Sequence, residues 1–380
     1  MKARKIFMDD DFTFCCPTKI YFRENRVSLI GKIIKEDYAF HKVYFVYGGH
    51  SLKKSGAYDK IVSSLKENGV DFQEYSGISA NPDIKDVRKM VEETKAYQPD
   101  LILAAGGGSV LDSAKCVAHG YYYDGDPLDF NKHLVQPLHA LPIATILTLA
   151  ASGSEMSDSC VISDYEHHFK NGFNSVTNYP LFSLMDPTLT LSVPPYQVGV
   201  GLADMFSHSL ERYLSPSHEQ EPCDDLALAV LKNIVEVSYR VISDPDDLAA
   251  RRTMMICGSL AHDGFTNYGK GKMFIIHKAE HKLSGAYPLL THGQGIALLM
   301  PKYLEVNKTI FKDKILRLSN VVFGIKTKSA TRGIQALKDW LLSLPIYHSY
   351  EELPFKVDPE EVKKAEAILK WKIKQTGDKK

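Results

Sequence analysis

The sequence predicts two parts: an α/β domain in residues 1–190 and an all-helical domain in residues 191–380. In the first part, apolar runs rich in β-branched and aromatic residues alternate with amphipathic helical patterns. This alternation is typical of a parallel sheet with helices on both faces. In the second part, helical patterns follow one another without intervening strands. Three prolines in MDPTLTLSVPP (185–195) separate the two parts.

The elements of the first part follow from local patterns. The segment IKDVRKMVEETKAY (84–97) carries apolar residues at helical spacing, and DLILAAGGGS (100–109) is an apolar run that ends in glycines. By the same criteria we expect strands near 42–49, 70–77, 100–109 and 141–151, and helices near 58–69, 84–97 and after Ser109. In the second part, the helical patterns are LADMFSHSLERYLS, EPCDDLALAVLKNIVEVSYRVIS and DDLAARRTMMICGSLAHDG.

Composition argues against several classes of protein. Lys plus Arg and Asp plus Glu number 46 each, so the formal net charge is zero. A nucleic-acid-binding or anionic-membrane-binding surface needs a basic surplus, and we expect neither partner. The six cysteines form no CxxC pair and follow no secretory segment, which favours free thiols in the cytoplasm. No stretch approaches the roughly 18–20 apolar residues of a membrane span.

The segment AAGGGSVLDSAK (104–115) joins a predicted strand to a predicted helix. Its glycines let a bound group approach the backbone closely, and the helix N-terminus offers free N–H groups to a phosphate. Ser109 is expected to cap the helix, with Asp112 at the spacing of a capping box. The segment is not GxGxxG, and a tight turn without a ligand is the alternative.

Two further turns strengthen the prediction of a nucleotide site. GGHSLKKSG (48–56) and TLAASGSE (148–155) also follow predicted strands, and open α/β sheets bind ligands at the carboxyl ends of their strands. Sites that prefer NAD commonly place an acid at a strand end such as 48–51, where it binds the ribose. Residues 48–51 contain no acid, and Lys53 and Lys54 stand two and three residues after Ser51. These features favour NADP over NAD.

The second part carries two pairs of candidate metal ligands at helical spacing. Asp204 and His208 lie four residues apart, as do His277 and His281, and His292 follows a loop. Side chains four apart share one face of a helix, and Asp with His suits Zn²⁺ or Fe²⁺. The alternatives are a capping or surface pair and structural histidines, since a chain with fourteen histidines forms chance clusters.

Together these motifs identify a resemblance. GGHSLKKSG, GISANP, GGGSVLDSAK, TLAASGSE, MDPTLT, GLADMFSHSLERY and THGQGIALLMP occur in the order found in the iron-containing (group III) alcohol dehydrogenases. The chain is most similar to the branch of NADPH-dependent butanol dehydrogenases and aldehyde reductases. The similarity extends from about residue 12 to about residue 320. The full set is specific, although no single motif is.

The resemblance implies a dehydroquinate synthase-like fold, with a dinucleotide-binding α/β domain, a helical metal-binding domain and an active site between them. It also implies a cytoplasmic homodimer or larger oligomer. Asp204, His208, His277 and His292 match the metal ligands, and His281 matches a histidine beside the metal that is not a ligand. The positions that match cofactor contacts are Gly49, Ser51, Asn81, Gly107, Gly108, Ser109, Asp112, Thr148, Leu149, Ser152, Ser157, Lys170 and Thr190.

The expected activity is reversible hydride transfer between NADP(H), or NAD(H), and a primary alcohol or aldehyde. One divalent metal, Fe²⁺ or Zn²⁺, would act as a Lewis acid, and His281 would relay the proton. A glycerol or diol dehydrogenase is the nearest alternative. A lyase related to dehydroquinate synthase is disfavoured by the few basic residues around 204–292. A non-catalytic nucleotide-binding relative is disfavoured because all four matched ligands are present.

Overall fold

The computed structural model describes residues 13–216, 221–271 and 273–370 of the 380-residue chain. Within these ranges, six strands form one parallel sheet with the order β1-β8-β5-β4-β2-β3. The strands are β1 (Lys19–Phe22), β2 (Lys42–Tyr47), β3 (Asp71–Ser76), β4 (Leu101–Gly106), β5 (Ile143–Leu147) and β8 (Phe182–Met185). The predicted parallel α/β sheet is therefore confirmed.

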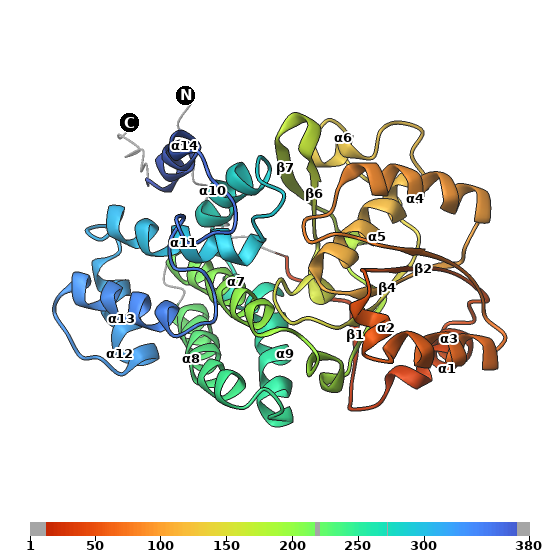
Figure 1. The fold of residues 1–380 in the computed structure, drawn as a ribbon, viewed down its shortest axis with the longest axis horizontal. Coiled ribbons are helices and arrows are strands. Elements are labelled where there is room, and N and C mark those ends of the chain that lie inside the picture. Colours follow the sequence, from red (N-terminus) through yellow and green to blue (C-terminus); the bar gives the residue numbers. More distant parts are fainter. Residues whose placement is uncertain (1–12, 217–220, 272, 371–380) are drawn as a thin grey trace.

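Helices cover both faces of this sheet because its strands are apolar on both sides (Figure 1). Tyr44 and Val46 of β2 face a core shared with α4 (Ile84–Tyr97) and α5 (Gly108–Gly120). Val43, Phe45 and Tyr47 face a second core with α1 (Ile30–Lys32) and α3 (Ala57–Glu67). The first core continues into the helical part of the chain.

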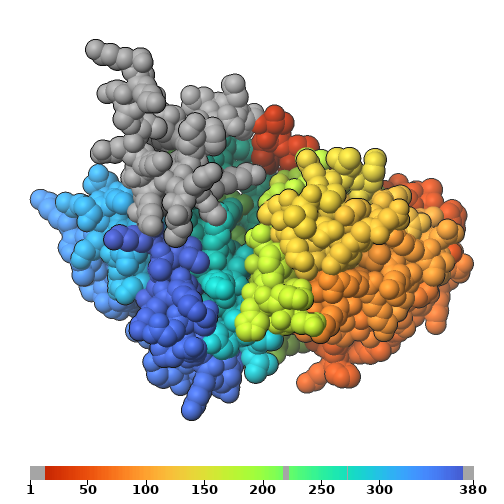
Figure 2. Space-filling view, turned by 90° about the horizontal axis from the view of Figure 1, so that it is seen from above, coloured from red at the N-terminus to blue at the C-terminus, as the bar shows by residue number. Residues whose placement is uncertain are grey.

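An antiparallel hairpin, which the sequence patterns did not predict, links the two parts. It consists of β6 (Ser159–Asp164) and β7 (Phe169–Asn174), and β7 packs against α10 (Ile275–Ser284). Figure 2 shows the lime-green surface of this region between the yellow surface of the first part and the teal surface of the second. The hairpin therefore brings residues of the α/β part to the helical part.

The helical part is built around α7 (Pro195–Leu214), which is buried from Val198 to Leu214. It packs against α8 (Glu221–Ser243), α9 (Leu248–His262) and α11 (His292–Val306). The chain from Pro195 to Lys370 contains no strand within the described residues. GLADMFSH, expected at the start of a helix, lies inside α7, because Pro195 occupies the first helical position.

The remaining elements are short or peripheral. The C-terminal helices are α12 (Lys312–Phe323), α13 (Ala330–Leu342) and α14 (Pro359–Leu369). The short ones are η1 (Val27–Leu29), η2 (Ile33–Asp37), α2 (Ser51–Lys54), α6 (Leu128–Asn131), η3 (Ser154–Met156), η4 (Tyr165–His167), η5 (Val176–Asn178), η6 (Pro187–Thr190) and η7 (Phe265–Asn267). None of the described helices combines the length and the apolarity that a membrane span requires.

Candidate metal and nucleotide site

The strand order places three predicted nucleotide-binding segments at one edge of the sheet. β3 extends the sheet on one side of β2, whereas β4, β5 and β8 extend it on the other. The loops after β2 and β4 therefore leave the sheet at its topological switch point, where open α/β sheets bind ligands. The loop after β5 lies beside them. All three strands run parallel, so their carboxyl ends meet at the same edge.

The glycine loop lies close against the loop that follows β5. A Cβ atom at Gly107 would lie 3.2 Å from Leu149, and one at Gly108 would lie 2.3 Å from Ser152 Oγ. A larger residue at position 108 would therefore push the two loops apart. This contact brings Gly107, Gly108, Leu149 and Ser152 together, with Thr148 at the start of the second loop.

The expected capping role of Ser109 and Asp112 is wrong. The helix begins two residues earlier than expected, at Gly108, because Gly107 adopts the extended N-cap conformation. Ser109 Oγ instead accepts a hydrogen bond from the Asn81 N–H at 3.3 Å. Asp112 accepts hydrogen bonds from Ser154 Oγ at 2.6 Å and from the Val161 N–H at 2.9 Å. Asp112 therefore connects α5 to the loop and the hairpin, and burial raises the pKa of its carboxyl.

The turn after β2 is open to solvent. Gly49 and Ser51 are exposed, and no atom lies within 4 Å of the position that a Cβ of Gly49 would take. An acid does stand nearby on β3, Glu74, which the sequence patterns did not single out. Its carboxylate accepts hydrogen bonds from Tyr47 Oη at 2.9 Å and Tyr58 Oη at 3.1 Å. The Glu74 carboxylate is thus hydrogen-bonded to two tyrosine hydroxyl groups.

Two of the expected cofactor residues contact the helical part. Asn81 Nδ2 donates to the carbonyl oxygens of Pro288 (3.2 Å) and Leu290 (3.0 Å). Lys170, on β7, is buried, and its ammonium group donates to Asn81 Oδ1 at 3.0 Å and to Ser284 Oγ at 2.8 Å. Both side chains thus lie at the junction of the two parts of the chain.

The hydroxyl groups of Ser157 and Thr190 form hydrogen bonds within the protein. Ser157 Oγ accepts from the Ser159 N–H at 3.0 Å, and Thr190 Oγ1 donates to the Pro187 carbonyl at 2.7 Å. The Ser157 carbonyl accepts a hydrogen bond from the fully buried Lys115 at 3.0 Å. In the structure these two hydroxyls therefore hold local turns.

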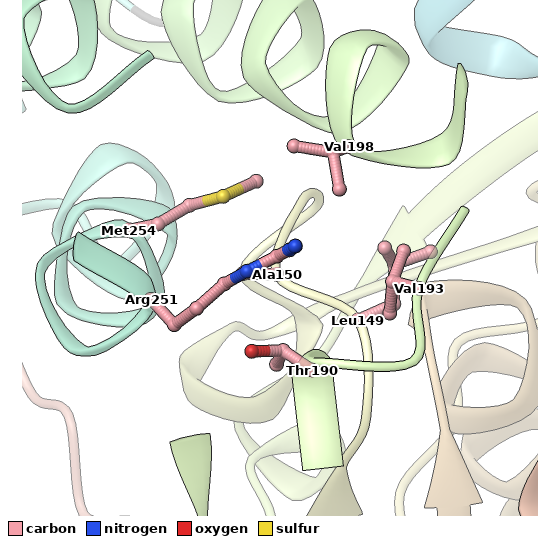
Figure 3. Close-up of a pocket in the computed structure, with 7 residues that line it drawn as sticks. All are labelled: Leu149, Ala150, Thr190, Val193, Val198, Arg251 and Met254. Atoms are coloured by element: carbon pink, nitrogen blue, oxygen red, sulfur yellow. The ribbon is translucent and has the colours of Figure 1, made fainter. Parts of the chain in front are cut away.

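A cavity beside the cofactor positions is too small for a substrate. Arg251 extends from α9 toward this cavity (Figure 3). The Nε atom of Arg251 donates a hydrogen bond to the Pro245 carbonyl oxygen at 3.0 Å. The volume of the cavity, about 10 Å³, leaves room for about one water molecule. Drug-sized ligands need about 300 Å³ or more. The lining residues are Leu149, Ala150, Thr190, Val193, Val198, Arg251 and Met254.

Four side chains from three helices converge at the expected metal site. Asp204 and His208 come from α7, His277 from α10, and His292 is the first residue of α11. Asp204 Oδ1 lies 3.6 Å from His208 Nδ1, 3.6 Å from His277 Nε2 and 3.6 Å from His292 Nε2. Ligand atoms about 2.0–2.1 Å from one tetrahedral zinc ion stand about 3.4 Å apart, so these separations fit a shared cation.

Three of the facing atoms are buried and have no hydrogen-bond partner within the described structure. They are Asp204 Oδ1, His208 Nδ1 and His277 Nε2. A buried polar atom without a partner costs about 1–3 kcal/mol, so three at one point need an external partner. Asp204, His208 and His277 also form a group whose potential ligand atoms lie within 4.8 Å of one another; His292 is outside this group and is joined to it through its 3.6 Å distance to Asp204. The donor set fits Zn²⁺ or Fe²⁺.

Two buried glutamates orient the histidines of this site. Glu211 contacts His277 Nδ1 and accepts a hydrogen bond from the Ile276 N–H at 2.7 Å. Glu280 contacts His292 Nδ1. These contacts leave the Nε2 atoms free to face Asp204, as carboxylates do behind metal-binding histidines. The sequence analysis missed both glutamates, although Glu211 lies three residues after His208 and Glu280 three residues after His277.

His262, at the end of α9, is another residue that the sequence analysis missed. Its ring centroid lies 4.3 Å from that of His208, and its Nδ1 lies 2.6 Å from the Ser152 carbonyl oxygen. Gly153 has a φ of +64°, and a Cβ there would lie 2.6 Å from His262 Cβ. His262 therefore connects the proposed cofactor loop directly to the metal site. The helical pattern of α9 gave no signal for this contact.

His281 lies one helical turn after His277 on α10. Its ring centroid is 5.4 Å from that of His292, and it can form a second group of potential ligands with Glu280 and His292. Burial, and then Lys170, lower the pKa of His281 well below its usual value. Burial and then His277 do the same for His208. Burial alone would raise the pKa of Glu280, but the charges of His292 and Lys170 lower it.

Comparisons with known proteins agree with this geometry. The family model "Iron-containing alcohol dehydrogenase" matches residues 17–187, and "Fe-containing alcohol dehydrogenase family, C-terminal" matches residues 200–373. The chain is 37% identical to NADH-dependent butanol dehydrogenase A of Clostridium acetobutylicum, over 96% of this chain and 94% of the relative. It is 29% identical to the NADPH-dependent aldehyde reductase YqhD of Escherichia coli, over 86% and 84%.

The fold agrees with solved structures of the same group. The crystal structure of NADH-dependent butanol dehydrogenase A from Thermotoga maritima superposes with a TM-score of 0.87 and 31% identity, over 95% of this chain and 99% of that chain. The E. coli YqhD structure superposes with a TM-score of 0.85 and 28% identity, over 95% and 93%. Sequence, fold and site lead to one assignment: the chain belongs to the iron-containing alcohol dehydrogenase family.

Proposed function

We propose that this enzyme interconverts primary alcohols and aldehydes with NADP(H) and one divalent metal, Fe²⁺ or Zn²⁺, and that butanol and butanal represent its substrates. Its relatives include proteins named butanol dehydrogenases and one named an aldehyde reductase. These names suit a small carbonyl substrate. A glycerol or diol dehydrogenase remains the competing activity, because a 1,3-propanediol dehydrogenase is also a relative, at 28% identity.

One observation carries the proposal: a buried, unpartnered carboxylate oxygen faces three histidine nitrogens directly beside the nucleotide loops. Asp204 Oδ1 is 3.6 Å from each nitrogen. The ring of His208 lies against that of His262, which contacts the Ser152 carbonyl in the loop after β5. A cation held at Asp204 would therefore lie close to a cofactor held by that loop.

The side chains divide the work of the reaction. When bound, the metal supplies Lewis acidity toward the substrate oxygen, and the nicotinamide supplies or accepts the hydride. Asp204, His208, His277 and His292 hold the cation. The glycine loop and the helix N-terminus of α5 offer N–H groups to the pyrophosphate. His281, beside the ligands, moves the proton to or from the substrate oxygen.

The preference for NADP(H) rests on the turn after β2. Gly49, His50 and Ser51 are exposed there, and none of them carries a negative charge that would repel a 2′-phosphate. Lys53 stands one turn further on, with its ammonium 4.7 Å from the Tyr58 ring centroid. The names of the relatives divide between NADH and NADPH, so they do not decide the matter.

Steady-state rates with NADPH and with NADH test the proposal. The protein is stripped with a chelator, reloaded with Fe²⁺ or Zn²⁺, and assayed with butanal. We expect turnover that needs metal and a higher kcat/KM for NADPH. A higher kcat/KM for NADH would overturn the cofactor preference alone. The absence of turnover with either cofactor despite bound metal would overturn the proposed activity. Faster turnover of glycerol or 1,3-propanediol than of butanol would favour the diol enzyme.

We also propose a division into domains 1–190 and 191–380, a homodimeric state and a cytoplasmic location. The last sheet strand ends at Met185 and α7 begins at Pro195, which supports the boundary; the ends of the two ranges, 1–12 and 371–380, lie outside the described residues. The six cysteines are free thiols, which suits a reducing compartment. Light scattering after size-exclusion chromatography tests the dimer.

A further inference from the structure

Lys170 connects the hairpin of the first domain to the metal site of the second. Besides its hydrogen bonds to Asn81 and Ser284, its ammonium nitrogen lies 3.5 Å from Glu280 Oε2. The Lys170 side chain is 3% exposed and the Glu280 side chain is fully buried. Strand β7 brings the lysine to α10, where Glu280 and Ser284 lie one helical turn apart (Figure 1).

The oxygen that Lys170 approaches also contacts the metal site. Glu280 Oε2 contacts Nδ1 of His292, and the other nitrogen of that ring faces Asp204 Oδ1 at 3.6 Å. One carboxylate oxygen thus lies between a lysine of the first domain and a proposed metal ligand of the second. A carboxylate held in place therefore holds the ring of His292 in one orientation, with the Nε2 atom of that ring facing the cation.

Lys170 is also connected to the nucleotide loop, through hydrogen bonds of Asn81. The Asn81 N–H donates to Ser109 Oγ, and its side-chain amide donates to Pro288 and Leu290 in the loop that leads to His292. Asn81 has a φ of +83°, an uncommon conformation for a non-glycine residue. The contacts run without a gap from Ser109 through Asn81, Lys170 and Glu280 to His292.

We propose that Lys170 is a positioning residue for the metal site, and that it couples nucleotide binding to metal binding. Lys170 holds Glu280, and Glu280 holds His292 in the geometry that a cation needs. A nucleotide bound at Ser109 and Asn81 restrains the same chain of contacts, so the metal then binds an already ordered site. The coupling is positive and reciprocal: each ligand tightens the other. The inference rests on the proposed metal and nucleotide sites and assigns Lys170 a role within them.

The dissociation constant of Zn²⁺, measured by competition with a chromophoric chelator, tests this role. In the wild type we expect NADPH to tighten Zn²⁺ binding by about fivefold or more. Lys170→Met is expected to weaken Zn²⁺ binding by about 10–100-fold and to abolish the effect of NADPH. The matched control is Lys85→Met, which removes a lysine from an exposed pair with Glu166 (3.4 Å). This control should behave as the wild type does.

A double variant distinguishes positioning from general damage to the fold. If Lys170 acts through Glu280, the variant with Lys170→Met and Glu280→Gln binds Zn²⁺ no more weakly than the weaker single variant. Losses that add would overturn the proposed route. Should Lys170→Met not fold in chelator, as judged by circular dichroism, Ser284→Ala replaces it. That variant keeps the charge and removes one contact, so we expect a smaller loss of affinity, and unchanged affinity would overturn the inference.

His292→Ala separates failure of this inference from failure of the proposed site. If the wild type binds Zn²⁺ and His292→Ala does not, the metal site stands. Wild-type affinity and wild-type coupling in Lys170→Met would then overturn only the role of Lys170. If His292→Ala binds Zn²⁺ as tightly as the wild type does, the proposed metal site itself is wrong.

Discussion

At the scale of single residues, Asp204 determines where the candidate metal site lies. It is 3% exposed, and its Oδ1 faces nitrogen atoms from three separate elements. The spacing of Asp204 and His208 indicated one shared helical face from the sequence alone. Nothing in the sequence placed His277 and His292 opposite that face, because their positions depend on how α10 and α11 pack on α7.

The role of His281 gives a prediction at the same scale. His281→Ala is expected to keep its metal and to lose about 10²–10⁴-fold in kcat, because a positioned acid–base group contributes that much. Metal content by mass spectrometry and kcat with butanal check this outcome. His348→Ala, an exposed histidine of the same domain, is the control. Loss of metal from His281→Ala would mean that His281 is a ligand.

At the scale of elements, close helix contacts position the candidate metal ligands. A Cβ at Gly293 would lie 2.1 Å from the Val200 carbonyl oxygen, so α11 approaches α7 backbone to backbone. His292 is the neighbouring residue, and its direction is therefore set by this contact. In the first domain, Gly31 makes an equally close contact with Ser64 of α3, where a Cβ would also lie 2.1 Å from a carbonyl oxygen.

These two glycines form a matched pair for an experiment. Gly293→Ala must move α11 away from α7, so we expect Zn²⁺ affinity to fall about tenfold or more. Gly31→Ala should lower the melting temperature through a similar clash but leave the Zn²⁺ affinity of the folded protein unchanged. Chelator competition and thermal melts measure both effects. Equal Zn²⁺ affinities in the two variants would contradict the role given to the contact between α11 and α7.

At the scale of the whole molecule, buried ionisable groups lower the free energy of unfolding. Asp263, at the end of α9, is 3% exposed, and its Oδ2 has no partner within the described structure. Burial raises its pKa from 3.8 to about 7; the hydrogen bond from the Phe265 N–H and the charge of Arg212 oppose the rise, and Glu155 adds to it. The folded protein therefore keeps a proton on Asp263 that the unfolded chain releases near pH 4.

The sign of the pH effect follows from this difference. Between about pH 4 and pH 7 the folded state binds more protons, so stability falls as pH rises, and above pH 7 the full cost is present. A change of about three in the pKa corresponds to about 4 kcal/mol of stability as an upper bound.

Asp263→Asn should therefore raise the melting temperature in chelator at pH 8 and change it much less at pH 5. Asp313→Asn, on the surface, is the control for the lost charge, and a gain of equal size at both pH values would contradict the prediction.

The amino-acid sequence was sufficient to predict the local elements and the type of chemistry. Strands β2 to β5 and helices α3, α4 and α5 lie where apolar periodicity placed them, because that periodicity records burial on a strand or on one helix face. The family assignment rested on short motifs in a fixed order. It is confirmed, since the two family models match residues 17–187 and 200–373. The β6–β7 hairpin escaped detection because β7, FKNGFN, has only two apolar residues and contains a glycine, so it carries no strand-like apolar pattern.

Which side chains act together became visible in the packing of the folded chain. Glu211, Glu280 and His262 were missed, because the partners that give them a role lie 50 or more residues away or across a loop. Ser109 and Asp112 fitted a capping box by spacing, yet the helix begins at Gly108 and both side chains bind neighbouring segments. Spacing fixes the neighbours of a residue along one element, whereas contacts between elements depend on how their surfaces pack, and that packing is a property of the whole chain.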